Sequence, residues 1–492
     1  MRIERDSLGE LEIPDDAYWG INTARALDNF AISRRAINVY PDLLIAYAQV
    51  KQAAARANLE IGSLDEDRAD LIDAACQEII DGKLHDQFIV GVIQGGAGTS
   101  TNMNVNEVIA NRALELGGYS KGEYEFISPN DHVNRSQSTN DTYPSAVKLA
   151  VAYGVEGLCQ EAKLLRNSFA QKGREFKDVL KVGRTQMQDA VPMTLGQEFR
   201  GFSTTLSEDI ERLEWAMPML FELNLGATAI GTGITAEKNY GPAVIRHLRE
   251  ITGEDSISLA VDLIEATSDT GVFMSISSEL KRMAMKLSKI CNDLRLLSSG
   301  PQAGLGEINL PAKQAGSSIM PGKVNPVIPE AVNQVAFVIA GADVTISLAS
   351  EAGQLQLNAF EPVMAHVLLQ NTTWLRRAIR TLRINCVDGI TANEDRLELQ
   401  VQQSVGVITA LMPKLGYLNA ATLAKRALKG GVSVRDLVIA EGLMAPAEVD
   451  AALEPAGLSG GLMDTSALPR LTPELIAAME EQLDEDDRYN EA

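Results

Sequence analysis

Apolar side chains recur at helical spacing through most of this chain of 492 residues. Leu206, Ile210 and Leu213, for example, are spaced so that they would line one face of a helix. The same pattern predicts helices over most of residues 41–81, and the alternation at 8–14 predicts a short strand or extended segment. Five long helices are expected in the middle of the chain, over residues 143–172, 194–223, 268–298, 327–354 and 358–385.

Two changes in the pattern divide the chain into three expected domains. Residues 128–141 contain almost no apolar side chain and precede a long helix, which predicts a boundary there. After about residue 395 the predicted helices become shorter, and residues 484–488 are expected to form a mobile acidic tail. The sequence therefore predicts a mostly helical N-terminal domain (1–141), a central helical bundle (142–394) and a small C-terminal helical domain (395–492).

Polar clusters rich in glycine and hydroxyl groups interrupt the predicted helices. The cluster at residues 95–104 holds three glycines and opens a helix, so that free backbone N–H groups would point toward an anion. Residues 316–326 combine glycines, prolines, two serines and a lysine, a composition suited to a mobile loop that closes over a small anion. Residues 183–192 and 224–233 repeat this chemistry at helix ends. We expect these breaks to meet in a shared site at one end of the bundle.

Composition and charge narrow the class of protein. Aromatic residues make up only 5% of the chain, which favours a mainly α-helical fold over a β-sandwich. The net charge of −22 argues against binding nucleic acid and against docking to an anionic membrane, although a small anionic substrate can still bind where positive charge is local. The four cysteines lie far apart, and neither a signal region nor a membrane-spanning apolar run is found. We therefore expect a soluble cytoplasmic protein with reduced thiols.

The reactive side chains favour recognition of carboxylates. The four histidines have no metal-ligand spacing, and neither a nucleophile elbow nor a dinucleotide-binding fingerprint occurs. The polar clusters instead supply hydroxyls, amides, backbone N–H groups, Lys323 and Arg184. Such a set can bind a dicarboxylate and stabilise a developing oxyanion without a protein-bound metal.

Residues 316–326, which read GSSIMPGKVNP, resemble the signature of the fumarase/aspartase superfamily, and motifs along nearly the whole chain agree with that family in order and spacing. The resemblance implies a mainly α-helical fold of three domains with a central five-helix bundle. It further implies a homotetramer with a twenty-helix core, in which three subunits share each active site. The implied reaction is an elimination: a base removes a proton beside a carboxylate, an enediolate forms, and a leaving group departs to give fumarate.

The resemblance also implies roles for individual residues. Ser317 matches the catalytic base, and Lys323 and Asn325 match residues that bind a substrate carboxylate. The residues that match groups holding the carboxylates and the amino group are Thr99, Ser138, Thr139, Asn140 and Thr185. Gln186 and Ser318 complete the expected substrate-binding set.

Gln186 bears on the choice of substrate. Fumarases carry a histidine after Gly-Arg-Thr at this break, and hydroxide is a leaving group that benefits from such an acid. Ammonia departs with less help, and residues 94–100 and 186–194 resemble aspartases. We therefore expect reversible deamination of L-aspartate, with class II fumarase and a non-catalytic structural member of the family as alternatives. No cofactor is expected to be required, while activation by a divalent cation such as Mg²⁺ stays open.

Overall fold

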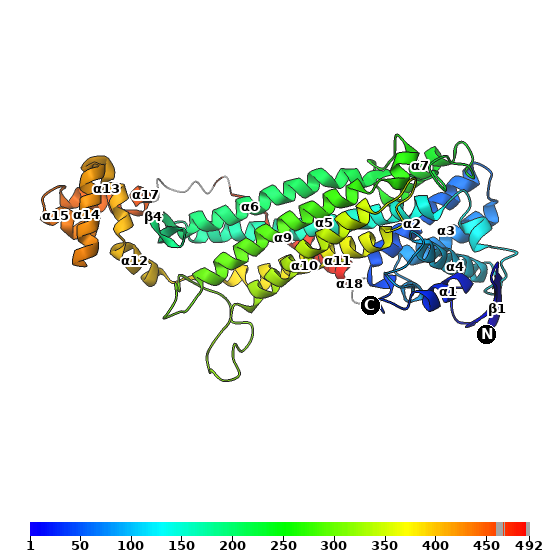
Figure 1. The fold of residues 1–492 in the computed structure, drawn as a ribbon, viewed down its shortest axis with the longest axis horizontal. Helices are drawn as coiled ribbons and strands as arrows, with labels where there is room; N and C mark the ends of the chain where they lie inside the picture. The colour runs from blue at the N-terminus through cyan, green and yellow to red at the C-terminus, as the bar shows by residue number, and fades with distance from the viewer. Residues whose placement is uncertain (459–465, 467, 489–492) are drawn as a thin grey trace.

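Five long helices form the body of the molecule in the computed structural model, which describes residues 1–458, 466 and 468–488 (Figure 1). Each helix contacts the next along the chain, and the last returns to the first, so that they close into a bundle. The bundle consists of α5 (Thr139–Glu175), α6 (Leu195–Ala216), α9 (Gly271–Leu297), α10 (Val327–Glu351) and α11 (Glu361–Asn385). The predicted mainly α-helical fold with a central five-helix bundle is confirmed.

The ends of these helices follow from local chemistry. Helix α5 begins at Thr139 rather than at residue 143 because Ser138 and Asp141 form a capping box at its N-terminus. Helix α6 ends at Ala216, before Pro218, and continues only as the 3₁₀ helix η4 (Met217–Phe221). The shifts are therefore caused by caps and prolines, while the periodicity correctly located the helices.

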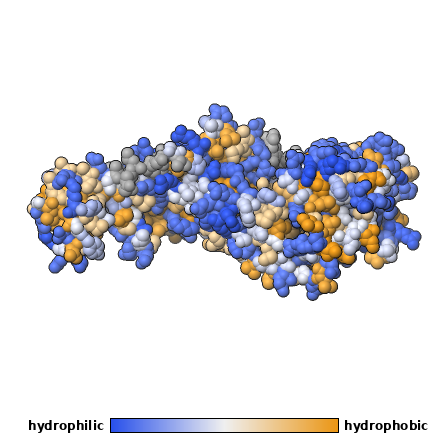
Figure 2. Space-filling view, turned by 90° about the horizontal axis from the view of Figure 1, so that it is seen from above, coloured by the Kyte–Doolittle hydropathy of each residue, from blue (hydrophilic) through white to orange (hydrophobic). Residues whose placement is uncertain are grey.

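The N-terminal region packs against one end of the bundle, and the two share one hydrophobic core. The extended segment expected at residues 8–14 is one strand of an antiparallel hairpin. In the space-filling view, hydrophobic patches lie on the half of the molecule that holds this region (Figure 2). The elements here are β1 (Arg2–Asp6), β2 (Gly9–Ile13), α1 (Ile21–Asn29), η1 (Ile37–Val39), α2 (Pro41–Glu60), α3 (Glu66–Ile80), η2 (His85–Gln87), α4 (Thr99–Leu116) and the π-helical turn η3 (Pro129–Val133).

Short elements connect the long helices. An antiparallel hairpin of β3 (Leu180–Thr185) and β4 (Gln188–Thr194) follows α5, where a polar break without strands was expected. Its turn consists of Gln186 and Met187, which is not a favoured hairpin-turn pair, so the sequence carried no turn signal there. The remaining connecting elements are β5 (Glu222–Leu223), α7 (Tyr240–Thr252), β6 (Ser258–Leu259), α8 (Leu263–Ser268), β7 (Ile308–Asn309), η5 (Val387–Gly389) and β8 (Thr391–Ala392).

Short C-terminal helices form a second hydrophobic core at the end of the molecule opposite the N-terminal region (Figure 1). They are α12 (Glu394–Gln403), η6 (Val405–Val407), α13 (Ile408–Leu415), α14 (Tyr417–Gly430), α15 (Val434–Ala440), α16 (Pro446–Leu453) and α17 (Pro455–Leu458). Helix α18 (Pro473–Arg488) contacts α5, and Glu480 pairs with Arg383 of α11 at 2.8 Å. The acidic residues 484–488, expected to form a mobile tail, instead belong to a helix that contacts the bundle. The domain boundaries proposed above stay a prediction.

Helix α10 leaves an apolar stripe uncovered in the single chain. Among the described residues it is the one helix long and apolar enough to cross a membrane by length and composition. It packs against α9 and α11, yet only 28% of its most apolar window is buried. Phe337, Val344 and Leu348, spaced to share one helical face, are 60%, 57% and 65% exposed. A stripe of this kind on a bundle helix fits a contact with another protein surface.

Candidate active site

The glycine cluster before α4 forms a tight turn at the N-terminus of that helix. Gly96 and Gly98 have φ of +86° and +92°, which favours glycine, and a Cβ at Gly98 would lie 2.4 Å from the ring of Tyr143. Thr99, the first residue of α4, is exposed and donates its hydroxyl hydrogen to the Gly96 carbonyl at 2.7 Å. The expected glycine turn that opens a helix is therefore present, with the exposed Thr99 hydroxyl at its end.

The N-terminus of α5 carries three more of the predicted residues. Ser138 caps the helix, since its Oγ accepts a hydrogen bond from the Asn140 backbone N–H at 3.2 Å. The Asn140 amide donates to the Ala229 carbonyl at 2.7 Å, which ties α5 to the loop at 224–233. Thr139 Oγ1 accepts a hydrogen bond at 3.1 Å from the amide of Asn102, one turn into α4. The structure thus brings Thr99, Ser138, Thr139 and Asn140 to two adjoining helix N-termini, whose dipoles favour an anion.

A buried lysine that sequence reasoning missed lies behind these helix ends. Lys51 of α2 is fully buried, and its ammonium donates to Asn102 Oδ1 at 2.8 Å, Gln137 Oε1 at 2.9 Å and Asn134 Oδ1 at 3.0 Å. Burial lowers the pKa of Lys51 to about 7. The lysine therefore fixes the amide of Asn102, which in turn orients Thr139. The available signal was a cation among the alanines and valines of a buried helix face.

Asp141 is the second buried ionisable group at this place. Its carboxylate accepts hydrogen bonds from the backbone N–H groups of Ser138 at 3.0 Å and Thr228 at 2.9 Å. Burial raises the pKa of Asp141 to about 7, against the lowering effect of these two hydrogen bonds. Asp141 thereby locks the cap of α5 to the loop at 224–233.

Thr185 and Gln186 lie at the far end of α5, on the β3–β4 hairpin. Both are exposed, and Gln186 and Met187 adopt positive φ of +53° and +63° in the two-residue turn. Helix α5 has 37 residues, so at about 1.5 Å per residue it separates this hairpin from Ser138 by roughly 55 Å. The expectation that all the polar breaks meet at one end of the bundle is therefore wrong for a single chain, because the breaks alternate between its two ends.

The loop at 316–326, which precedes α10, lies at the same end of the bundle as the hairpin (Figure 1). Ser317 Oγ accepts hydrogen bonds from the backbone N–H groups of Ile319 at 3.2 Å and Met320 at 3.0 Å. The Asn325 amide closes the neck of the loop by donating to the Gly316 carbonyl at 2.5 Å. Two donors aimed at a serine oxygen would stabilise its ionised form, which a serine base requires.

Lys323 and Ser318 lie on the exposed part of the same loop. Within the described part of the chain, neither side chain has a hydrogen-bond or ion-pair partner. Both are therefore available to a ligand.

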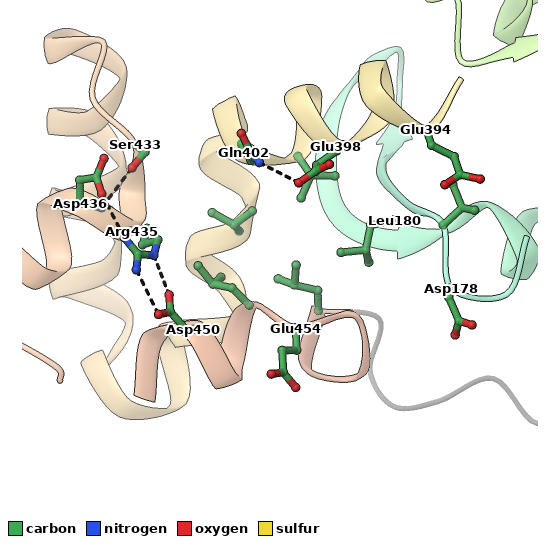
Figure 3. A pocket seen from close by; sticks show the side chains of 15 residues that line it. Asp178, Leu180, Glu394, Glu398, Gln402, Ser433, Arg435, Asp436, Asp450 and Glu454 are labelled. Carbon is green, nitrogen blue, oxygen red and sulfur yellow. Dashed lines mark hydrogen bonds and ion pairs between the residues drawn. The ribbon is translucent and has the colours of Figure 1, made fainter. Parts of the chain in front are cut away.

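A cavity of about 720 Å³ next to the C-terminal core contains none of the predicted site residues (Figure 3). Its rim is acidic, and its polar groups largely satisfy one another: Arg435 binds both carboxylate oxygens of Asp450 at 2.6 and 3.0 Å, and Gln402 donates to Glu398 at 3.0 Å. A site for a dicarboxylate needs unpaired positive groups. Cavity size therefore does not identify the active site here.

In the ranges described, no group of three or more His, Cys, Asp and Glu side chains is placed to hold a metal ion. We assign no step of the reaction to one.

Comparison with known proteins gives the family. Residues 9–341 match a family model described as lyase, and residues 407–460 match one described as the fumarase C C-terminus. Aspartate ammonia-lyases of Pseudomonas canavaninivorans and Helicobacter pylori are each 54% identical, covering 96% and 93% of this chain and 98% of their own length. The Escherichia coli aspartate ammonia-lyase is 51% identical, covering 92% of this chain and 94% of its own length.

Solved structures agree with this assignment. A fumarate lyase:delta crystallin from Brucella melitensis, bound to cobalt, aligns with a TM-score of 0.91 at 52% identity, over 93% of this chain and 99% of that one. A class II fumarase from Schistosoma mansoni aligns with a TM-score of 0.87 at 34% identity, over 93% of this chain and 99% of that one. Fold, signature loop and relatives agree, and the chain belongs to the fumarase/aspartase superfamily.

Proposed function

We propose that this enzyme catalyses the reversible deamination of L-aspartate to fumarate and ammonia. The observation that carries the mechanism is the Ser317 hydroxyl, whose oxygen accepts two backbone N–H groups in the signature loop. The substrate is supported by the aspartate ammonia-lyases that match over nearly the full chain, and by Gln186 where fumarases have histidine.

Ser317 acts in this proposal as the base. Its alkoxide, stabilised by the two backbone donors, removes a proton from the carbon beside one carboxylate of aspartate. The negative charge passes into that carboxylate as an enediolate, and ammonia leaves from the neighbouring carbon. Lys323 and Asn325 bind a carboxylate from the signature loop, with Ser318 beside them. The helix N-termini that carry Thr99, Ser138, Thr139 and Asn140 supply the remaining donors, which strengthen as charge develops.

The complete site needs more than one subunit. The α5 N-terminus and the hairpin with Thr185 and Gln186 stand about 55 Å apart along one helix, farther than a four-carbon substrate can span. We therefore propose a homotetramer in which three subunits contribute the α4/α5 ends, the hairpin and the signature loop to each site. The exposed apolar stripe of α10 supports this assembly, since another copy of the bundle would cover it.

Fumarate hydration is the second candidate activity. The structural likeness to the Schistosoma class II fumarase favours it, because the same scaffold supports that family. Against it stands Gln186, which cannot supply the proton that helps hydroxide to leave. Loss of Ser317, Lys323 or Asn325 would have favoured a non-catalytic structural role, and the presence of all three argues against it.

We further propose that the enzyme works in the cytoplasm and needs no organic cofactor. The four cysteines are buried and unpaired, as in a reducing compartment. Activation by Mg²⁺ is tested by treating the enzyme with a chelator and restoring the ion; a rate that does not change after either step shows that the ion is not an activator.

The function is tested with the purified protein and two substrates, L-aspartate and malate. Fumarate formation, followed by its ultraviolet absorbance, is expected from L-aspartate together with one equivalent of ammonia. Turnover of malate without turnover of aspartate would instead identify a fumarase. Failure with both substrates, across pH and with Mg²⁺ added, would support the structural alternative.

A further inference from the structure

Glu307 is a buried carboxylate to which the sequence analysis gave no role. It is fully buried beside β7 and lies 2.8 Å from the ammonium of Lys181 and in contact with the guanidinium of Arg184, both on β3. Its own backbone is fixed to the bundle end, because its N–H donates to the Leu297 carbonyl at 2.8 Å and its carbonyl accepts from Asn393 at 2.9 Å. Glu307 is thus an anchor on the bundle for the strand that carries Thr185.

Both cations reach the same carboxylate although they lie three residues apart on β3, where the pairing of the hairpin is irregular. In a regular strand Lys181 and Arg184 would point to opposite faces, since side chains alternate along it. The strand register shifts between Val182 and Arg184, around Gly183, where a Cβ would lie 2.8 Å from the Val191 carbonyl oxygen. Ala190 and Val191 of β4 together oppose Gly183 there, so the extra residue of the bulge lies on β4 and the hairpin is irregular directly before Arg184. Thr185 follows in the strand as an exposed residue.

The two cations depend on Glu307 to different extents. Lys181 has a second partner, Glu198 of α6, at 2.6 Å. Arg184 has only a weak contact with the Val182 carbonyl at 3.4 Å besides Glu307 among the described residues. Loss of the Glu307 charge would therefore release Arg184, the residue directly before Thr185, more than Lys181.

We propose that Glu307 is a positioning residue, which holds the β3–β4 hairpin through Arg184 so that Thr185 and Gln186 meet the substrate of another subunit. This inference rests on the proposed function for the role of Thr185 and Gln186. A purely structural ion cluster would change the stability of the fold without lowering kcat/KM of the folded oligomer, whereas a positioning role lowers kcat/KM through Glu307 and Arg184.

The test compares three variants of the intact oligomer. Glu307→Gln and Arg184→Gln are each expected to lower kcat/KM for L-aspartate about 100-fold, as misplacement of a binding group does. Glu198→Gln is the matched control: it disturbs Lys181 in the same cluster but leaves the contact between Glu307 and Arg184, and it is expected to change kcat/KM by less than about threefold. Equal losses in Glu307→Gln and Glu198→Gln would overturn the inference. Because Arg184 is partly exposed, Arg184→Gln is expected to fold, and it tests the inference even if Glu307→Gln does not fold.

A double-mutant cycle separates positioning from stability. If Glu307 acts through Thr185, the hydroxyl that it positions is already absent from Thr185→Ala. Adding Glu307→Gln to that variant is therefore expected to lower kcat/KM by less than about threefold. If the loss of kcat/KM in the double variant instead equals the product of the losses in the two single variants, the inference is contradicted.

Amide hydrogen exchange gives a readout that needs no turnover. Residues 183–189 are expected to exchange faster in Glu307→Gln than in Glu198→Gln, and equal exchange in the two variants would refute the inference. An inactive wild type with this difference in exchange would instead reject the proposed function while leaving the anchoring of the hairpin intact.

Discussion

The ammonium of Lys51 lies 2.8 Å from Oδ1 of Asn102, and the amide nitrogen of Asn102 lies 3.1 Å from the hydroxyl of Thr139. A fully buried cation thus reaches a predicted substrate-binding hydroxyl through one amide. Lys51→Met would leave Gln137 Oε1 without its donor, at a cost of about 1–3 kcal/mol, and would remove the charged donor from the Oδ1 atoms of Asn102 and Asn134, which keep weaker donors. We expect a clear loss of stability and a raised KM for aspartate. Urea unfolding and steady-state kinetics measure both.

Lys83→Met is the control for that variant. Lys83 is 62% exposed in its side chain and pairs with Glu78 at 3.4 Å, so its loss should change neither property measurably. Equal behaviour of the two variants would show that the Lys51 network does not support the site.

The two neighbouring serines of the signature loop differ in their surroundings. Ser317 Oγ accepts two backbone N–H groups, whereas the side chain of Ser318 is exposed and has no partner among the described residues. Ser317→Ala is expected to lower kcat at least about 1,000-fold while the oligomer stays intact, since a nucleophile or base removed alone costs about that much or more. Ser318→Ala should cost far less. A near-normal rate in Ser317→Ala would remove Ser317 from the role of base.

The glycine turn before α4 has no room for a side chain. Gly98→Ala would bring a Cβ to 2.4 Å from the Tyr143 ring at a φ of +92°, so both contact and backbone are strained. We expect a loss of roughly 2–4 kcal/mol in unfolding free energy together with lower activity. Gly118→Ala, at a φ of +81° with no atom within 4 Å of the new Cβ, isolates the backbone cost and should lose only about 1 kcal/mol. Equal losses of unfolding free energy in Gly98→Ala and Gly118→Ala would show that the close contact with Tyr143 adds no cost.

Glu361 at the start of α11 predicts a pH dependence of stability. Burial raises the pKa of Glu361 to about 8, so the folded protein holds a proton that the unfolded chain releases above its ordinary value of 4.5. Between these two values, rising pH favours the unfolded chain. Glu361→Gln removes this effect. We therefore expect the melting temperature of the variant, relative to that of the wild type, to increase as pH rises from about 5 to about 8.

The exposed Glu351 at the end of α10 provides the control for this measurement. The melting temperature of Glu351→Gln should change with pH in the same way as that of the wild type between about pH 5 and pH 8. A constant difference between Glu361→Gln and the wild type would show that Glu361 is ionised in the folded protein.

The long helices could be predicted because their apolar periodicity persists over many turns, as in Leu206, Ile210 and Leu213 of α6. The signature loop could be assigned because its residues are contiguous in sequence. The hairpin at 180–194 was missed because Gln186 and Met187 form its turn without glycine or asparagine. Glu307 gave no signal, and Lys51 gave only that of a cation among apolar residues, since the partners that define them lie 51 or more residues away from Lys51 and 123 or more from Glu307.

The positions of the polar breaks in space depend on the direction in which each helix runs, which the apolar periodicity does not reveal. Helices that run back and forth put successive breaks at opposite ends of the bundle, so Ser138 and Thr185 bracket the whole length of α5. In the proposed assembly, several chains bring such breaks together, and the sequence of one chain does not encode that geometry in any local pattern.

The central claim is that segments lying apart in one chain act together at one site, and hybrid oligomers test it most directly. Ser317→Ala and Asn140→Ala change two different segments, and each variant alone should be nearly inactive. When the two are unfolded together and reassembled in equal amounts, roughly a quarter of the sites should draw both segments from unmutated copies. We predict recovery of up to about a quarter of the wild-type rate of fumarate formation from aspartate. Reassembled hybrids of normal size that are no more active than the parent variants would contradict the shared site.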